Sequence, residues 1–116
     1  MNFQEAVQTV FSKYADFTGR AGRSEFWWFA LFNLIASLVI GMIDQAIFGQ
    51  EILGFIFALG VLLPGVAVAA RRLHDIDRSG WWLLIALIPL IGWIVLIYWY
   101  ISEGTPGANQ YGGQPA

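Results

Sequence analysis

The chain has 116 residues, of which 58% are hydrophobic, 16% aromatic and only 12% charged. Ordinary soluble domains carry roughly 25% charged residues, so this composition indicates a membrane protein. A chain of this length is expected to form a single domain, here residues 1–116. The sequence contains no cysteine, which excludes disulfides, thiolate metal sites and a cysteine nucleophile.

Residues 1–15 predict an amphipathic helix. Apolar residues at positions 3, 7, 10, 11 and 14 recur at helical spacing, and polar residues occupy the rest of the helical wheel. Asn2 followed three residues later by Glu5 is typical of a capping box. Such a helix either lies in the membrane interface or packs on the cytoplasmic ends of the spans. The segment lacks the basic start and apolar core of a cleavable signal peptide, so we expect the first span to be retained.

Three long apolar runs follow, and each predicts a transmembrane helix. They cover residues 26–43, 52–70 and 81–101, and none contains a charged residue. A bilayer core of about 30 Å needs about 20 helical residues, so each run has a suitable length. Residues 102–116 are rich in glycine and proline and predict turns or a flexible tail. The expected fold is therefore all-α: a polytopic membrane protein with three transmembrane helices preceded by an N-terminal amphipathic helix.

Small and polar residues recur on one face of each of the first two spans. On the first span they are Ala30, Asn33, Ser37, Gly41 and Asp44, and on the second they form the pairs Gly54 with Ala58 and Gly65 with Ala69. The main interpretation is a helix-packing seam, because small residues let helices approach closely in a membrane. A transport path lined by Asn33 and Asp44 is the alternative, because polar groups at membrane depth are often functional.

The lysines and arginines predict how the chain sits in the membrane. They form one cluster before the first span and another between the second and third: Lys13, Arg20, Arg23, and Arg71, Arg72, Arg78. The positive-inside rule then predicts a multi-pass plasma (inner) membrane protein with a cytoplasmic N-terminus and an outside C-terminus. Three spans agree with that arrangement.

The stretch from residue 71 to residue 82 concentrates the ionisable side chains between two apolar runs. On a helix, oppositely charged neighbours three or four positions apart can pair, so the main interpretation is an ion-pair lattice at the cytoplasmic interface. The alternative is binding of anionic lipid or phosphate, since the planar guanidinium suits bidentate phosphate contacts. The candidate residues for both interpretations are Arg20, Arg23, Arg71, Arg72, His74, Asp75 and Arg78.

Catalysis has little support in the sequence. His74 oriented by Asp77 or Asp75, with Ser79 as a distant nucleophile, is the only candidate, and no phosphate loop, metal cluster or nucleophile elbow accompanies it. We therefore expect no catalytic residue, cofactor or metal, and the few, balanced charges predict no nucleic-acid partner.

The leading functional interpretation is a non-enzymatic interaction or scaffold module in the lipid bilayer, which self-associates as a homo-oligomer or docks a membrane partner. Small residues on the first two spans favour it. Binding of anionic lipid and transport of a small solute are the alternatives.

Several motifs in order along the chain resemble those of a known family. They are FTGRAGRSEFWW at 17–28, Pro64 followed by RRLHD at 71–75, RSGWW at 78–82, IPLIG at 88–92 and GTPGANQYG at 104–112. Together they resemble the bacterial inner-membrane domain-of-unknown-function 805 family, the YhaH-like proteins, over nearly the whole chain. The resemblance implies a plasma-membrane protein of a few helices, and it carries no established activity or catalytic residue.

Overall fold

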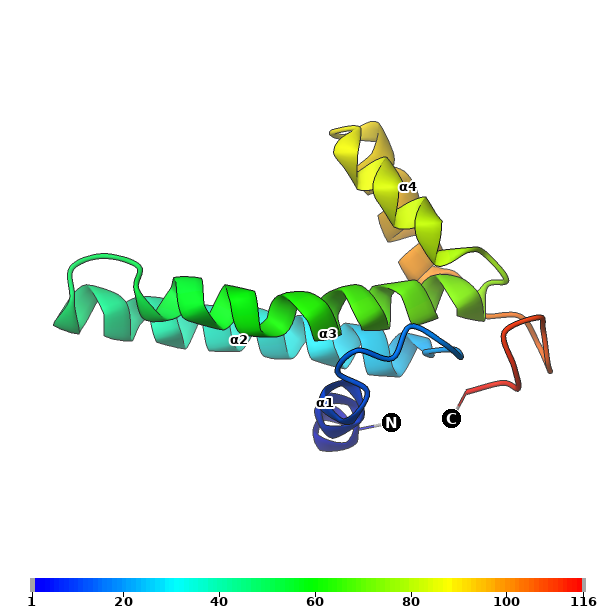
Figure 1. Ribbon diagram of the computed structural model, residues 1–116, viewed down its shortest axis with the longest axis horizontal. Helices are drawn as coiled ribbons and strands as arrows, with labels where there is room; N and C mark the ends of the chain where they lie inside the picture. Colours follow the sequence, from blue (N-terminus) through cyan, green and yellow to red (C-terminus); the bar gives the residue numbers. More distant parts are fainter. Residues whose placement is uncertain (1, 116) are drawn as a thin grey trace.

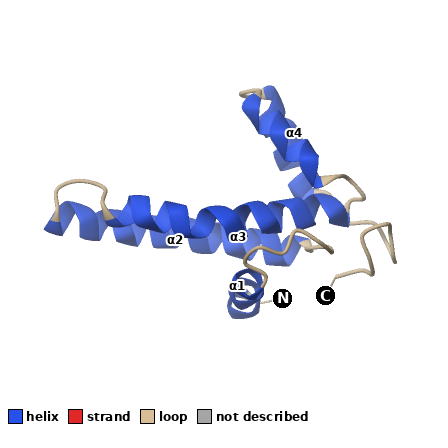
Figure 2. Ribbon diagram, viewed as in Figure 1, coloured by secondary structure: helices blue, strands red, loops and turns tan. Residues whose placement is uncertain are grey.

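The computed structural model describes residues 2–115 and contains five helices in that range. They are α1 (Phe3–Ser12), α2 (Arg23–Ile47), α3 (Leu53–Asp75), the 3₁₀ helix η1 (Gly80–Leu87) and α4 (Ile91–Ile101). Figure 2 shows only helices and loops over this part of the chain, so the all-α prediction is confirmed. Residues 1 and 116, which the predicted N-terminal helix and tail include, lie outside the described residues.

Helices α2 and α3 run side by side in opposite directions and give the molecule its length (Figure 1). They have 25 and 23 residues, and the most apolar stretch of 18 residues in each has a mean hydropathy of 2.0 in α2 and 2.3 in α3. Only 6% of that stretch in α2 and 22% of it in α3 are buried inside the molecule. A core helix of a soluble protein would be mostly buried, so the exposed apolar surface is suited to lipid. Among the described residues, these are the two helices long and apolar enough to cross a membrane.

Asp44 closes the turn between these two helices. Its carboxylate accepts hydrogen bonds from the backbone N–H groups of Leu53 (2.9 Å) and Gly54 (2.8 Å) in the first turn of α3. The side chain thus caps α3 although it comes from α2, and Asp44 is completely buried. This contact gives Asp44 a structural role and weakens the interpretation of a transport path that uses it.

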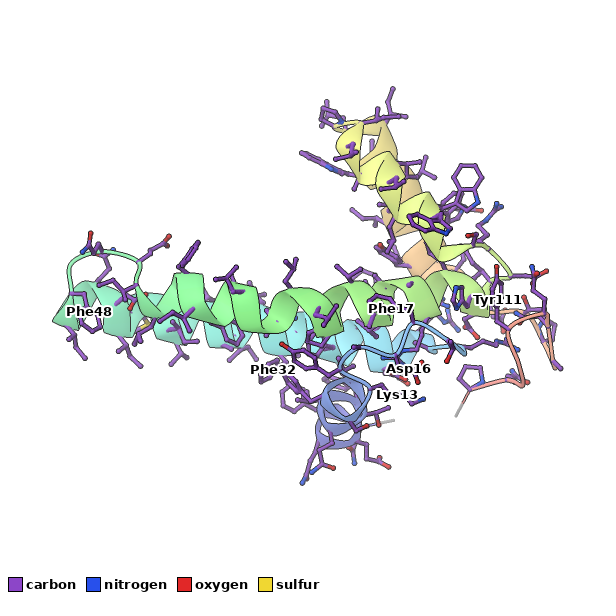
Figure 3. All side chains as sticks on the ribbon, in the orientation of Figure 1. Lys13, Asp16, Phe17, Phe32, Phe48 and Tyr111 are labelled. Atoms are coloured by element: carbon purple, nitrogen blue, oxygen red, sulfur yellow. The ribbon has the colours of Figure 1, made fainter. Side chains whose placement is uncertain are left out.

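Helix α1 packs across the side of the α2/α3 pair and is seen nearly end-on in Figure 1. Asn2 and Glu5 form the predicted capping box, with both reciprocal hydrogen bonds present. Aromatic rings join α1 to α2: the Phe11 and Phe29 centroids lie 5.6 Å apart, and Phe32 lies at the same junction (Figure 3). This packing gives α1 a fixed partner, and its position in the membrane interface stays a prediction.

The third apolar run does not form the single transmembrane helix predicted over residues 81–101. It folds into a helical hairpin made of η1, a turn at residues 88–90, and α4 (Figure 1). Pro89 disfavours a helical conformation at the residue before it, and Leu90 has a positive φ of 67°, which reverses the chain. At Gly92 a Cβ atom would stand 1.7 Å from the carbonyl oxygen of Ile85, so the two arms touch through their backbones.

The hairpin returns the chain to the end of α3 from which it started. The described part of the tail, residues 102–115, therefore lies beside the loop that precedes α2. Figure 3 shows Asp16 and Tyr111 toward one end of the α2/α3 pair and Phe48 at the other. The predicted outside C-terminus assumed a third complete crossing, which the hairpin does not supply as a single helix. The side of the membrane on which the C-terminus lies stays a prediction.

Candidate functional site

Buried charged side chains fill the end of the molecule where α3, the loop before α2, the hairpin and the tail meet. We call this set the arginine cluster and define it as Arg20, Glu25, Arg71, Arg72, His74 and Asp75. These residues are between 0% and 9% exposed. A buried charge is costly unless it is paired and hydrogen-bonded, so the contacts of each member decide what the cluster can do.

The helix dipoles suit the charges of three of these residues, Arg71, Arg72 and Glu25. Four members lie in the last turns of α3, where the C-terminal end of the helix dipole favours the cations Arg71 and Arg72. Glu25 lies in the first turn of α2, where the dipole favours an anion. Arg20 comes from the connecting loop, which is anchored to α3 by a backbone hydrogen bond from Ala21 to Arg71 (2.9 Å).

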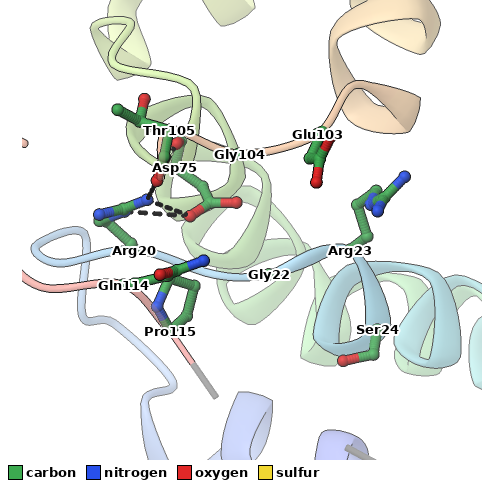
Figure 4. A pocket seen from close by; sticks show the side chains of 10 residues that line it. All are labelled: Arg20, Gly22, Arg23, Ser24, Asp75, Glu103, Gly104, Thr105, Gln114 and Pro115. Atoms are coloured by element: carbon green, nitrogen blue, oxygen red, sulfur yellow. Dashed lines mark hydrogen bonds and ion pairs between the residues drawn. The ribbon is translucent and has the colours of Figure 1, made fainter. Parts of the chain in front are cut away.

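Asp75 is the centre of the cluster because its carboxylate bridges two guanidinium groups. Arg20 Nη2 lies 2.9 Å from Asp75 Oδ1, and Arg72 Nη1 lies 2.8 Å from Oδ2. Figure 4 shows Arg20 reaching both Asp75 and the tail residue Thr105. Arg72 and Asp75 are three positions apart on α3, as the sequence pattern predicted, whereas Arg20 arrives from a distant loop.

The tail is bound through its backbone carbonyl groups. Arg20 donates to the carbonyl oxygens of Thr105 (2.6 Å) and Gly107 (2.6 Å). Arg72 donates to Ser102 and, over 3.1 Å, to Tyr100. Charge-assisted hydrogen bonds of this kind are stronger than neutral ones. The two arginines therefore tie the tail to α3 and use most of their donors within the chain.

Arg71 pairs with Glu25 rather than with Asp75, its neighbour four positions along. Arg71 Nη1 lies 2.5 Å from Glu25 Oε2, and Nε donates to the backbone oxygen of Asp16 over 3.2 Å. The pair joins the end of α3 to the start of α2. Hydrogen bonds from the Thr18 side chain and backbone lower the pKa of Asp16 below its ordinary value.

His74 is held on two sides. Its Nδ1 atom lies 2.9 Å from the backbone oxygen of Gly19; because a carbonyl only accepts hydrogen bonds, we assign the proton to Nδ1. The Tyr111 ring stacks on the imidazole with centroids 3.9 Å apart and planes at 3°. Among the described residues, Gly19 and Tyr111 hold the imidazole, rather than Asp75 or Asp77, the partners that the sequence offered.

Two of the predicted residues, Arg23 and Arg78, are not members of the cluster. Arg23 lies at its edge, beside Glu103 in a polar pocket of about 370 Å³ that Arg20 and Asp75 also line (Figure 4). Its Nη1 atom is 3.4 Å from the backbone oxygen of Ile101. Arg78 follows the end of α3, and its guanidinium lies 4.4 Å from the centre of the Trp99 ring on α4.

The tail residues Thr105, Asn109 and Tyr111 are the members of the site that sequence reasoning missed. Thr105 N–H donates to the Asp75 backbone oxygen (2.7 Å), and the Asn109 amide donates to that of His74 (2.9 Å). Their motif was visible at residues 104–112, but nothing in its spacing relates it to α3. Within residues 2–115 no group of three or more histidine and acidic side chains is placed to hold a metal ion.

Two lipid-suited helices, a helical hairpin and an ion-paired end define a small all-helical membrane protein. The chain belongs to the family described as Protein of unknown function (DUF805), whose model matches residues 14–113. It is 46% identical over 109 residues to the inner membrane protein YhaI of Escherichia coli strain K12, an alignment that covers 92% of each chain.

Other relatives agree with this assignment. The inner membrane protein YhaH of the same strain is 46% identical over 111 residues, 91% of this chain and 92% of the relative. The uncharacterized protein YiiR is 35% identical over 100 residues, 77% of this chain and 60% of the relative. No solved structure matches the chain. The family resemblance and the inner-membrane class are therefore confirmed.

Proposed function

We propose that this protein is a non-enzymatic interaction module of the inner membrane, and that it self-associates through a groove between α2, α3 and the hairpin. The groove has a volume of about 530 Å³. Small and polar side chains from three elements line it, among them Asn33, Ser37, Gly54, Ala58, Gly65 and Ala86. Small residues of this kind let a second helix approach closely in a bilayer.

Asn33 is the observation that carries the proposal. Its amide nitrogen donates to the Phe29 backbone oxygen over 3.2 Å, which leaves the other amide hydrogen and the side-chain oxygen for further bonds. A polar group facing hydrocarbon without a partner is costly. An asparagine carries both donors and an acceptor, so it can pair with its own copy across a two-fold axis. A second copy of the chain is therefore the occupant that we propose.

Binding of anionic lipid is the second candidate. It is supported by the polar pocket at the start of α2, which Arg20 and Arg23 line and where the positive end of the helix dipole favours an anion. Against it, Arg20 and Arg72 spend their donors on Asp75 and the tail, and Glu103 shares the pocket with Arg23. We therefore rank self-association first.

Because the chain contains no cysteine, cysteine crosslinking in native membranes tests the proposal directly. Ser37→Cys, inside the groove, should give a disulfide-linked dimer with a short oxidant pulse. Leu34→Cys, on the same helix but outside the groove and 57% exposed, is the matched control and should not. Asn33→Leu combined with Ser37→Cys should reduce the dimer several-fold.

Two results would count against self-association. Equal crosslinking at positions 34 and 37 would mean random collision in the membrane. A Ser37→Cys adduct only with a different protein would replace the second copy by another membrane partner.

A further inference from the structure

A separate pocket of about 490 Å³ lies between α3 and η1, beside the arginine cluster. Small-molecule sites in proteins typically have volumes of roughly 300–1,000 Å³, with mostly apolar walls and a few converging polar groups. This pocket has the same construction. Its walls include Val66, Leu83 and Leu84, and two polar side chains, His74 and Ser79, line it too.

His74 offers the pocket a hydrogen-bond acceptor. Since Nδ1 carries the proton that contacts Gly19, the neutral ring leaves Nε2 with a free lone pair. Nε2 is the ring atom nearest to Gly80, another lining residue: a Cβ at Gly80 would stand 3.5 Å from it. Stacking on Tyr111 and the bond to Gly19 hold the ring in place. The acceptor is therefore fixed before any ligand binds.

Ser79 offers a donor. Its Oγ atom accepts a hydrogen bond from the Trp81 backbone N–H over 3.2 Å, as the cap of η1. This bond uses a lone pair of the oxygen and leaves the hydroxyl hydrogen available. His74 thus presents an acceptor and Ser79 a donor to a pocket that Tyr111 also lines.

We propose that this pocket binds a free fatty acid from the bilayer. The acid O–H would donate to His74 Nε2, and the acid carbonyl would accept from the Ser79 hydroxyl. If the proton moves to Nε2, the resulting imidazolium and carboxylate keep the same two contacts in a charge-assisted form. The hydrocarbon chain would lie along Val66, Leu83 and Leu84. A fatty acid ester has no O–H to donate to His74 and can only accept from Ser79.

The test uses the full chain in lipid nanodiscs and a long-chain fatty acid that carries a photoreactive diazirine in its tail. After irradiation, mass spectrometry should map the adducts to residues 66 and 83–84. An excess of unlabelled palmitic acid should reduce this labelling at least five-fold. The methyl ester of the same probe should label these residues no more than the rest of the lipid-facing surface.

Two variants separate the ligand contact from folding. His74→Asn keeps an amide N–H at the position of Nδ1, for Gly19, but removes Nε2 and the ring that stacks on Tyr111. It should lower specific labelling at least five-fold in protein whose circular dichroism shows that it is folded. Ile56→Ala, an exposed α3 position outside the pocket, should leave labelling unchanged. Equal labelling by acid and ester, or full labelling of a folded His74→Asn protein, would overturn the proposal.

Discussion

The carboxylate of Asp75 lies directly against the backbone of Gly104. A Cβ atom at residue 104 would stand 2.1 Å from Asp75 Oδ2, closer than any real contact allows. The tail can cross the end of α3 at this point only because glycine has no side chain. Two residues 29 positions apart in the sequence thus determine whether the ion pairs of Asp75 and the tail can exist together.

We predict that Gly104→Ala destabilises the protein by about 1–3 kcal/mol, as expected for overpacking of a filled interior. Either Asp75 must leave Arg20 and Arg72 or the tail must lift away. Gly113→Ala is the control, because a Cβ there meets no atom within 4 Å. Unfolding in detergent, followed by circular dichroism, measures the difference, and equal stability of the two variants would contradict the prediction.

Gly92→Ala should disrupt the hairpin more severely, because the new Cβ would meet backbone rather than a movable side chain. We expect a loss above about 3 kcal/mol or a chain that does not fold. Gly41→Ala on α2, with open space around it, should have little effect. Trp93 donates to the Ala86 oxygen across the turn (2.9 Å), so a shift in tryptophan fluorescence should accompany the loss. A Gly92→Ala protein with native stability would show that η1 and α4 do not touch.

The hairpin predicts that the tail and the N-terminal helix face the same side of the membrane. Ser12 on α1, Ala108 in the tail and Gln50 in the turn between α2 and α3 are all exposed, so each can be replaced by cysteine. In intact cells and inverted vesicles, a membrane-impermeant maleimide should label the first two variants alike and the third from the other side. Labelling of positions 108 and 50 from the same side of the membrane would contradict this prediction and would support a third crossing of the membrane.

Asp44→Ala should destabilise the turn between α2 and α3. It removes the acceptor of two N–H groups at the start of α3, and the loss of a helix cap costs about 0.5–2 kcal/mol. Asp44→Asn keeps one acceptor oxygen, so its stability should lie between those of the wild-type protein and Asp44→Ala. Gln45→Ala, at an exposed neighbour, serves as the control. A thermal unfolding series that ranks the four proteins differently would contradict the capping role.

The local features of the fold could be predicted from the sequence. Helical periodicity and the Asn2 and Glu5 pair located α1, and the uncharged runs located α2 and α3, because each pattern depends on neighbours in the chain. The third run could not be assigned correctly by the same reasoning. Its hydropathy is that of a spanning helix, and the reversal depends on a positive φ at Leu90, a conformation that non-glycine residues rarely adopt.

The candidate site likewise contains contacts that could be predicted from the sequence and contacts that could not. The pairing of Arg72 with Asp75 follows from their spacing on one helix. The tail contacts do not, because Arg20 and Arg72 bind backbone oxygens, and every residue has one. Sequence patterns identify side chains that pair with side chains, so the contribution of the tail became visible only in three dimensions.

The dependence of Arg20 and Arg72 on tail carbonyls also sets an order of assembly. Both arginines leave the ribosome well before Ser102, Thr105 and Gly107, the residues that supply their acceptors. While the two long helices enter the bilayer, the guanidinium groups must therefore remain hydrated at its surface. The end of α3 can close only after the tail has been synthesised, so a message truncated after α4 would yield an inserted protein with an open, hydrated end.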